Sequence, residues 1–171
     1  MTYRAPRPLQ DSDDRRGFNC QPDTQGKWLR EQARQAHKLG TSRVFVVTEL
    51  GSDDVVAYFA WCMASVAKQD TTALLAYRAG GYAQPVALLS RLGVHVDHSG
   101  KGLGRDLLRD ILLRTARLMD EIGCRGLHVH AEDDRARAFY LHLLPEFEPS
   151  PANPLRLVLL TQDIHQHLQA E

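Results

Sequence analysis

The sequence has few of the features that mark secreted, membrane or metal-binding proteins. Among its 171 residues there are only three cysteines, at positions 20, 62 and 124, and no CxxC pair. We therefore expect reduced thiols in a cytoplasmic protein and no cysteine zinc site. The longest apolar run, Val55 to Ala64, has ten residues and is too short to cross a bilayer. The N-terminal segment is charged and lacks the apolar core of a secretory signal.

The chain also lacks an excess of charge of one sign. It has 21 Lys/Arg and 21 Asp/Glu residues, and this balance argues against indiscriminate nucleic-acid binding. The charge is uneven, because residues 1–43 carry nine Lys/Arg and five Asp/Glu, whereas residues 131–171 carry three and seven. A local basic face with an acidic region elsewhere is compatible with this pattern. With 43% hydrophobic and 25% charged residues, the composition is otherwise typical of one globular domain.

Hydrophobic periodicity predicts an α/β domain with a mixed β-sheet flanked by helices. We expect residues 1–16 to form a loose or strand-adding arm, while residues 162–171 carry no clear pattern. Between them the pattern first predicts a helix from Asp23 to Leu39, which Asp23 or Thr24 caps and Gly40 ends. A hairpin of strands 43–50 and 55–68, a short helix at 73–78 and a strand at 86–96 are expected next. The last predicted elements are a helix from Arg105 that Gly123 ends, a strand at 126–131, a helix at 133–144 and a strand at 155–160.

The most informative segment is the glycine-rich turn between the strand at 86–96 and the following helix. Its residues read Ser-Gly-Lys-Gly-Leu-Gly from position 99 to 104. Three alternate glycines let the backbone approach a ligand closely, and the free amides of a helix N-terminus favour a phosphate there. Lys101 and Arg105 add positive charge to this end of the helix.

Several phosphate-binding motifs compete for such a loop. A P-loop needs GxxxxGK[ST], and this string is absent from the chain. A dinucleotide site needs GxGxxG, but counting from Gly100 or Gly102 places Arg105 or Leu107 at the third glycine. The remaining ligand is the pyrophosphate of coenzyme A. A tight turn without a ligand is the alternative interpretation.

Four segments of the chain match patterns of one superfamily. SRLGVHVDHSGKGLGRDLL (90–108) is similar to an acetyl-CoA motif whose loop reads Q/R-x-x-G-x-G/A, and RARAFYLHL (135–143) resembles a later helix that bears a catalytic tyrosine. GFNCQPDTQGKWLREQARQAHKLGTSRVFVV (17–47) and EPSPANPLRLVL (148–159) resemble the two end segments of one subfamily. The chain is thereby identified as a member of the GNAT N-acetyltransferases, closest to the toxins of bacterial toxin–antitoxin modules.

The resemblance implies a single-domain GNAT fold over residues 17–161, with a mixed central β-sheet flanked by helices. It implies an enzyme that moves acetyl from acetyl-CoA to the α-amino group of aminoacyl-tRNA. Such a toxin would block translation, form a homodimer and be neutralised by a cognate antitoxin. The resemblance also assigns acetyl-CoA binding to Leu92, Gly93, Val94, Ser99, Gly100, Lys101, Gly102, Leu103, Gly104 and Arg105.

Two positions depart from the family pattern. The first loop position, usually Gln or Arg, is Ser99, and the glycine-phenylalanine before the EPSP segment is Glu146-Phe147. Because backbone amides supply most of the phosphate cradle, Ser99 predicts weaker coenzyme binding rather than none.

Tyr140 is the expected catalytic acid, by similarity to the family's Phe-Tyr motif. A thiolate leaving group needs a proton, and a phenol with a pKa of about 10 can donate to a thiolate whose thiol pKa is about 8.5. The alternative is that Tyr140 only packs on the inner face of its helix.

A general base is missing from the predicted cofactor strand, which offers Ser90 and Arg91 instead of a carboxylate. A lysine amine, with a pKa of about 10.4, would need such a base, whereas an α-amine near 7.7–8 is already partly neutral. The sequence therefore predicts an α-amine acceptor with water as the proton route. Glu49 on the neighbouring strand is the alternative base.

A tRNA substrate also needs contacts to its phosphates. Arg91 is notable as a charge within an apolar strand, and it either lines a polar site or pairs with a carboxylate. The substrate-binding candidates are Lys27, Arg30, Arg34, Lys38, Arg78 and Arg91, with ordinary solvated charge as the alternative for those on the first helix.

We expect no metal site, because no cysteine or carboxylate completes a ligand set with His95, His98, His128 and His130. Trp28 and Trp61 are expected in the core. Two rival functions stay open: a GNAT enzyme that acetylates a protein N-terminus or a small amine, and a degenerate GNAT that binds only coenzyme A or a protein partner.

Overall fold

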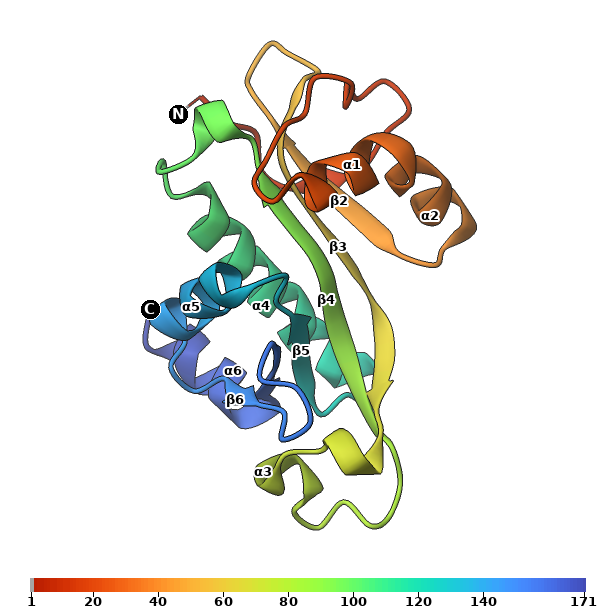
Figure 1. Cartoon of the computed structure of the whole chain (residues 1–171), viewed down its shortest axis with the longest axis vertical. Helices are drawn as coiled ribbons and strands as arrows, with labels where there is room; N and C mark the ends of the chain where they lie inside the picture. Colours follow the sequence, from red (N-terminus) through yellow and green to blue (C-terminus); the bar gives the residue numbers. More distant parts are fainter. Residues whose placement is uncertain (1) are drawn as a thin grey trace. The chain divides into compact units, whose positions relative to one another are not determined.

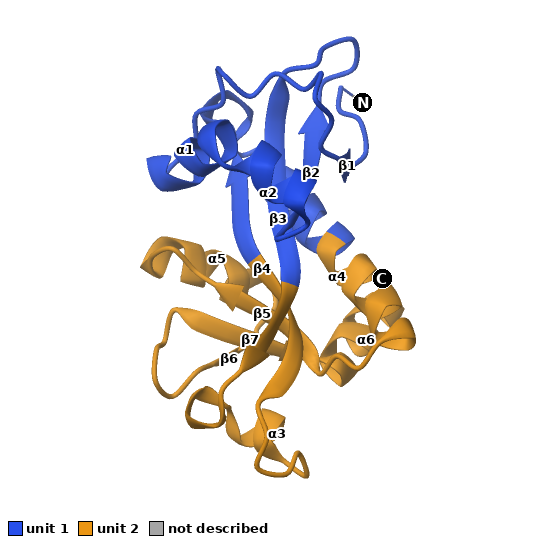
Figure 2. Ribbon diagram, turned by 90° about the vertical axis from the view of Figure 1, so that its right-hand side faces the viewer, with its two compact units in different colours: residues 1–62, 90–110 blue, residues 63–89, 111–171 orange. Residues whose placement is uncertain are grey.

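The computed structural model describes residues 2–171, which form two compact units (Figure 2). The first unit contains the chain up to residue 62 and residues 90–110, and the second contains residues 63–89 and 111–171. Strands β3 (Val55–Val66) and β4 (Gln84–Val94) and helix α4 (Leu103–Glu121) run from one unit into the other. The predicted boundaries after residues 16 and 161 stay predictions.

One mixed sheet of seven strands has the order β1-β2-β3-β4-β5-β7-β6 (Figure 1). Strand β4 pairs in parallel with β5, and the pairs β1–β2, β2–β3, β5–β7 and β6–β7 are antiparallel. The central place of β4 agrees with its predicted apolar character. The remaining strands are β1 (Arg7–Pro8), β2 (Arg43–Thr48), β5 (Gly126–His130), β6 (Glu148–Pro149) and β7 (Arg156–Leu160).

The first unit packs two helices, α1 (Asp23–Glu31) and α2 (Ala33–Leu39), on strands β2 and β3 (Figure 1). Leu29 and Ala33 are fully buried against valines of β2 and against Tyr58. One continuous helix was expected, but the backbone at Gln32 leaves helical geometry with φ −121°. Glu31, Gln32 and Ala33 are residue types with no strong helix-breaking tendency, so the sequence alone does not signal this break.

The ends of this helical segment only partly follow the prediction. Gly40 ends α2 in the left-handed conformation with φ 77°, as expected from its lack of a side chain. Neither Asp23 nor Thr24 is the N-cap, because Pro22 occupies that position. Leu39 was expected on the inner face but is 68% exposed at the last position of α2.

The N-terminal segment adds a strand to the sheet, which is one of the two predicted alternatives. Arg7 and Pro8 pair with β2, and the amide of Leu9 donates to the carbonyl of Val44 at 2.9 Å. Arg7 also donates two hydrogen bonds to the buried carboxylate of Asp13, at 2.6 and 2.9 Å. These contacts hold the segment against the first unit.

The second unit is built on strands β5, β7 and β6. Leu75 of the short helix α3 (Ala73–Ala76) packs with Val86, Val158 and Leu160 in a buried cluster. Asp133 caps helix α5 (Asp134–Leu143), and its side chain accepts from the amide of Ala136. Helix α6 (Thr161–Gln169) was missed from the sequence, because its only fully buried residue is Ile164 and no longer apolar stripe marks it.

Candidate active site

The glycine turn takes the geometry that its composition predicts. A short 3₁₀ helix (Val96–His98) leads from β4 to the turn, and α4 begins at Leu103, two residues earlier than expected. Gly100 and Gly102 have φ values of 76° and 85°, a conformation that L residues other than glycine rarely adopt. Gly104 lies inside the helix and needs no such freedom. Two of the three glycines are therefore required by the backbone.

The turn presents a row of free amides at the start of α4. Over residues 2–171, the amides from Gly100 to Arg105 donate to no other group of the chain, and the first helical bond runs from Asp106 to the carbonyl of Gly102 at 3.0 Å. A helix N-terminus with unpaired N–H groups carries partial positive charge and binds phosphate. The free amides of Gly100 to Arg105 thus form a preformed anion-binding site, called the amide cradle below.

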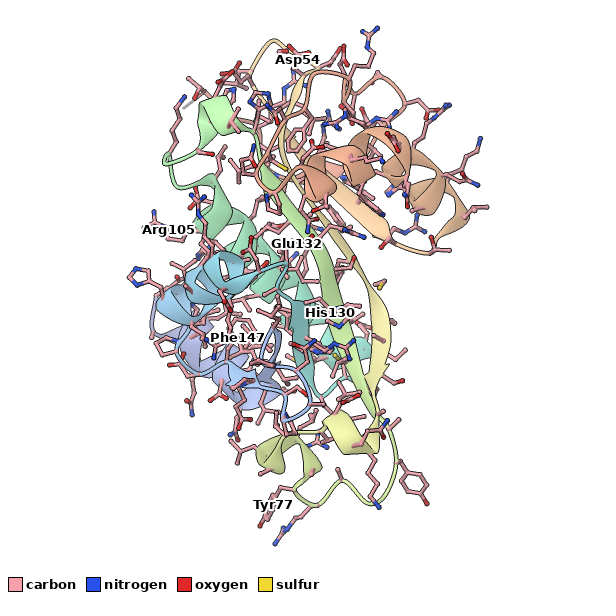
Figure 3. The ribbon with its side chains drawn as sticks, viewed as in Figure 1. Asp54, Tyr77, Arg105, His130, Glu132 and Phe147 are labelled. Atoms are coloured by element: carbon pink, nitrogen blue, oxygen red, sulfur yellow. The ribbon has the colours of Figure 1, made fainter. Side chains whose placement is uncertain are left out.

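The side chains around this cradle contribute less than its backbone. The hydroxyl of Ser99 donates to the carbonyl of His95 at 3.3 Å, within the turn itself. Lys101 is exposed, and Arg105 is 72% exposed with its nearest carboxylate, Asp106, at 3.8 Å (Figure 3). Both cations extend into solvent and are available to an anion. Leu103 is buried and anchors the first turn of α4.

The end of β4 offers a second element for a ligand. Its pairing with β5 ends at Leu89, opposite Val129, so in the described chain residues 90–94 have no strand partner on that edge. Such an edge leaves amide and carbonyl groups free at alternate residues. Leu92 and Val94 are half-buried there.

Gly93 has a packing role in the same strand. A Cβ atom at this position would lie 2.9 Å from Cε1 of Tyr58 and 3.4 Å from both Cys20 and Phe18. The glycine therefore lets β4 approach the aromatic core of the first unit. Sequence reasoning assigned Gly93 to coenzyme binding alone.

Tyr140 lies in α5 of the second unit and is 5% exposed. Its ring packs edge-on against Phe139 and Phe147, with centroids 5.2 and 6.0 Å away. Within the described residues its hydroxyl makes no hydrogen bond. Burial raises the pKa of the phenol well above its ordinary value, so the group holds its proton at neutral pH. The side chain is a neutral donor without a structural partner.

No carboxylate lies on the central part of β4. Ser90 donates to the carbonyl of Ala60 at 3.2 Å. The guanidinium of Arg91 lies 5.5 Å from the ring centroid of Trp28, and it has no carboxylate partner in residues 2–171. The structure thus favours the aromatic contact over the predicted ion pair. Glu49, the alternative base, has one oxygen 4.0 Å from Nδ1 of His98.

Two of the four cations predicted on the first helix are engaged in structural contacts. Arg30 donates to the carbonyl of Phe18 at 2.5 Å, and Arg34 pairs with Asp11 at 2.8 Å. The contact of Arg30 holds the loop before α1 rather than presenting a free charge. Lys27 and Lys38 are exposed.

Arg78 has a different setting in the second unit. It is exposed, adopts a positive φ of 56°, and its guanidinium lies 5.3 Å from the ring centroid of Tyr77.

The histidines do not gather into a metal centre. In the part of the chain that the structure describes, no three His, Cys, Asp or Glu side chains lie close enough to ligate one ion. Instead, Nδ1 of His98 hydrogen-bonds the hydroxyl of Tyr3 at 2.8 Å. Sequence reasoning missed Tyr3, although an aromatic residue in an otherwise polar arm was the available signal.

The two tryptophans are half-buried rather than fully in the core. Trp28 stacks on Tyr58 with centroids 6.1 Å apart, and the indole nitrogen of Trp61 is buried without a hydrogen-bond partner in the described residues.

Within residues 2–171, no helix combines the length and apolar character needed to span a membrane.

The chain is an α/β protein in which the amide cradle of the first unit suits a phosphate-bearing ligand and the phenol of α5 in the second unit is a buried proton donor. Residues 40–143 match the family model described as an acetyltransferase (GNAT) domain. The chain is 42% identical over 161 residues to the tRNA-acetylating toxin of Mycobacterium tuberculosis, covering 94% of each chain. The chain therefore belongs to the GNAT acetyltransferase family, as the motifs indicated.

Solved structures show the same fold at lower identity. AtaT complexed with acetyl-methionyl-tRNAfMet is 20% identical, with a TM-score of 0.86 over 96% of this chain and 98% of AtaT. A tyrosine-to-phenylalanine variant of AtaT, bound to acetyl-CoA and to the C-terminus of the antitoxin AtaR, is also 20% identical, with a TM-score of 0.81 over 99% of both chains. At this identity the likeness establishes the fold.

The residues present fit the acetyl-CoA that GNAT enzymes use. The free amides of Gly100 to Arg105 suit a pyrophosphate, because two positive-φ glycines hold them open and two exposed cations flank them. The unpaired edge of β4 at residues 90–94 suits an extended ligand that carries amide groups. When bound, the coenzyme supplies an activated acetyl thioester.

Proposed function

We propose that this chain transfers acetyl from acetyl-CoA to the α-amino group of an aminoacyl-tRNA. The observation that carries the proposal is the 42% identity to a tRNA-acetylating toxin, which extends over 94% of both chains. A match of this extent includes the segments on either side of the acetyl-CoA motif, and it is therefore specific to a subfamily rather than to GNAT enzymes in general.

The chemistry divides among a few residues. The amides of Gly100 to Arg105 hold the pyrophosphate, and Lys101 and Arg105 neutralise part of its charge. Tyr140 gives its phenolic proton to the sulfur as the carbon–sulfur bond breaks, and the acceptor nitrogen forms the new bond to the acetyl carbon. The proton released from that nitrogen passes to water, and a water returns a proton to Tyr140.

The environment of Tyr140 suits this role. Its hydroxyl has no partner within the described chain, so proton donation breaks no structural hydrogen bond. Burial raises its pKa, so the phenol carries its proton at neutral pH. General acid catalysis of this kind contributes about 10²–10⁴-fold.

The missing carboxylate supports an α-amine as the acceptor. Ser90 and Arg91 occupy the strand where a base would stand, and both already have contacts. An α-amine with a pKa of about 7.7–8 is partly neutral at pH 7.5, whereas a lysine amine near 10.4 is almost fully protonated. The chain should therefore prefer the α-amine.

The biological setting follows from the same proposal. Acetylated aminoacyl-tRNA cannot accept a growing peptide on its blocked amine, so the enzyme would stop translation in the cytoplasm. A solved relative carries the C-terminus of an antitoxin, and we propose a cognate antitoxin for this chain as well. We also propose a homodimer, in line with the resemblance noted from the sequence.

The test is transfer of labelled acetyl from acetyl-CoA to total charged bacterial tRNA by the wild type and Tyr140→Phe. Tyr82→Phe is the matched control, because Tyr82 is 80% exposed. We expect label in aminoacyl-tRNA, a loss of at least about tenfold in Tyr140→Phe, and no change in Tyr82→Phe. Label in peptides or small amines but not in any charged tRNA would overturn the substrate assignment, and coenzyme binding without transfer would indicate a degenerate enzyme.

A further inference from the structure

A cluster of nitrogen side chains on strands β5 and β7 has no role in the function described so far. In the antiparallel register, His130 lies opposite Arg156, and His128 lies opposite Val158. Opposed residues of antiparallel strands, and residues two apart on one strand, share a face of the sheet. His128, His130 and Arg156 therefore project from the same face of the second unit.

The side chains in this cluster lack partners of their own. The rings of His128 and His130 meet edge-on with centroids 4.7 Å apart. His128 is 6% exposed, and its Nδ1 is sealed without a hydrogen-bond partner. A buried polar atom without a partner costs free energy, so such an atom in a native structure calls for a ligand or a functional reason.

The other two members of the cluster are accessible. His130 is exposed at the end of β5 (Figure 3), and Arg156 is half-buried with no carboxylate partner in the described residues. The guanidinium and the two imidazoles together form a set of donors that nothing in residues 2–171 satisfies.

Arg156 is held in position by a tight turn. The amide of Ser150 donates to its carbonyl at 2.8 Å, and its own amide donates to the carbonyl of Asn153 at 3.0 Å. The side chain of Asn153 also accepts from the amide of Leu155 at 3.0 Å. These bonds fix the backbone from which the side chain of Arg156 extends.

One carboxylate shares this face of the sheet, because Glu148 lies opposite Val158 in the register of β6 and β7. Glu148, on the neighbouring strand β6, receives a hydrogen bond from Thr72 and makes no ion pair with Arg156. Desolvation, the neighbouring His130 and Arg156 lower the pKa of His128 to about 4. Desolvation and Arg156 also lower that of His130. Both rings are thus neutral, and each can donate one N–H beside the guanidinium.

We propose that His128, His130 and Arg156 form a phosphate-binding site that holds the sugar–phosphate backbone of the tRNA substrate. The guanidinium provides a planar fork of donors that matches phosphate oxygens, and the imidazoles complete the set. A cation is disfavoured by Arg156. This inference rests on the proposed function, and it adds a contact that sequence reasoning did not assign.

Two phosphate sources share this chemistry, the tRNA backbone and the 3′-phosphate of coenzyme A. The amide cradle of Gly100 to Arg105 accounts for the pyrophosphate of the coenzyme but not for its 3′-phosphate. We assign the tRNA, because its backbone carries a phosphate at every nucleotide. The experiment measures binding of uncharged tRNA and, separately, of acetyl-CoA by the full chain carrying Arg156→Gln or His130→Gln. Arg117→Gln and His142→Gln are the matched controls, since both residues are exposed and outside the cluster.

We expect Arg156→Gln to weaken tRNA binding about tenfold at moderate salt and to lower the salt slope by about 0.7–0.9. Arg156→Lys should restore part of the affinity, which a misfolded protein would not do. Acetyl-CoA binding should be unchanged. Weakened acetyl-CoA binding with intact tRNA binding would assign the site to the coenzyme and overturn the proposal, as would unchanged binding of both.

Failure of this inference is distinguishable from failure of the proposed function. If the wild type acetylates charged tRNA and Arg156→Gln binds tRNA normally, only the phosphate site is wrong. If the wild type binds no tRNA and acetylates none, the proposed substrate is wrong, and the phosphate site for tRNA falls with it.

Discussion

A single methyl group at Gly93 should disturb the packing of β4 against the aromatic core of the first unit. In Gly93→Ala the new Cβ would lie 2.9 Å from Cε1 of Tyr58, about 0.5 Å inside ordinary van der Waals contact. Tyr58 cannot easily move, because it is fully buried, its hydroxyl donates to the carbonyl of Gln25 at 2.6 Å, and its ring meets Phe18 and Trp28. The strain must therefore appear as a shift of β4 or of the aromatic cluster.

Overpacking of a well-packed core costs about 1–3 kcal/mol. We expect Gly93→Ala to lower the free energy of unfolding by that amount in urea denaturation, and to raise the KM for acetyl-CoA because the free edge of β4 moves. Gly17→Ala is the matched control, since a Cβ there meets nothing within 4 Å. A Gly93→Ala protein as stable as the wild type would refute the reasoning from this contact.

Three further predictions concern single side chains. Because the pKa of His128 is lowered to about 4 in the folded chain, its contribution to the free energy of unfolding should be fully present above pH 6.5 and be lost between pH 6.5 and 4. His128→Gln should reduce this pH dependence when denaturation is measured at each pH. Tyr3→Phe removes the 2.8 Å hydrogen bond to His98 before the glycine turn, so the KM for acetyl-CoA should rise severalfold while kcat stays constant. Arg30→Met removes the bond to the carbonyl of Phe18 and the exposed 3.4 Å ion pair with Asp23, and it should destabilise the chain by about 0.5–1.5 kcal/mol.

Each of these three variants has a control that replaces an exposed residue of the same or a similar type. His165→Gln tests whether loss of any exposed histidine changes the acid profile, and Tyr82→Phe tests loss of a solvated hydroxyl. Lys27→Met removes an exposed charge from the same helix as Arg30 and should leave stability within about 0.5 kcal/mol. An equal effect in a control and its partner would contradict the assigned contact.

The fold could be predicted wherever a strong local pattern meets a chain breaker. The hairpin of β2 and β3, the glycine turn and the helix that follows it all combine apolar periodicity with glycine or turn residues, and all are present. The break at Gln32 and helix α6 could not be predicted, because long-range packing decides both. Short strands such as β1 depend on a partner far along the chain and leave no local signal.

The chemistry of the site was predictable to a different degree. Backbone requirements are visible in sequence, since Gly100 and Gly102 need a conformation that other residues avoid. The partners of a charged side chain are not visible, because Arg34 pairs with Asp11 from a segment 23 residues earlier. The role of Gly93 in packing and the unpaired Nδ1 of His128 also emerge only in three dimensions.

The internal partners of its arginines determine how a chain of zero net charge can bind an RNA. The positive excess of residues 1–43 suggested a binding face on the first helix, but Arg30 and Arg34 are tied to a carbonyl and a carboxylate and have lost most of that potential. Charges without a carboxylate partner are worth more to a phosphate, because no internal ion pair must break first. On this argument Arg91 and Arg156, rather than the most basic stretch of sequence, are the arginines whose removal should most weaken tRNA binding. Two well-placed guanidinium groups can then act in a chain whose net charge is zero.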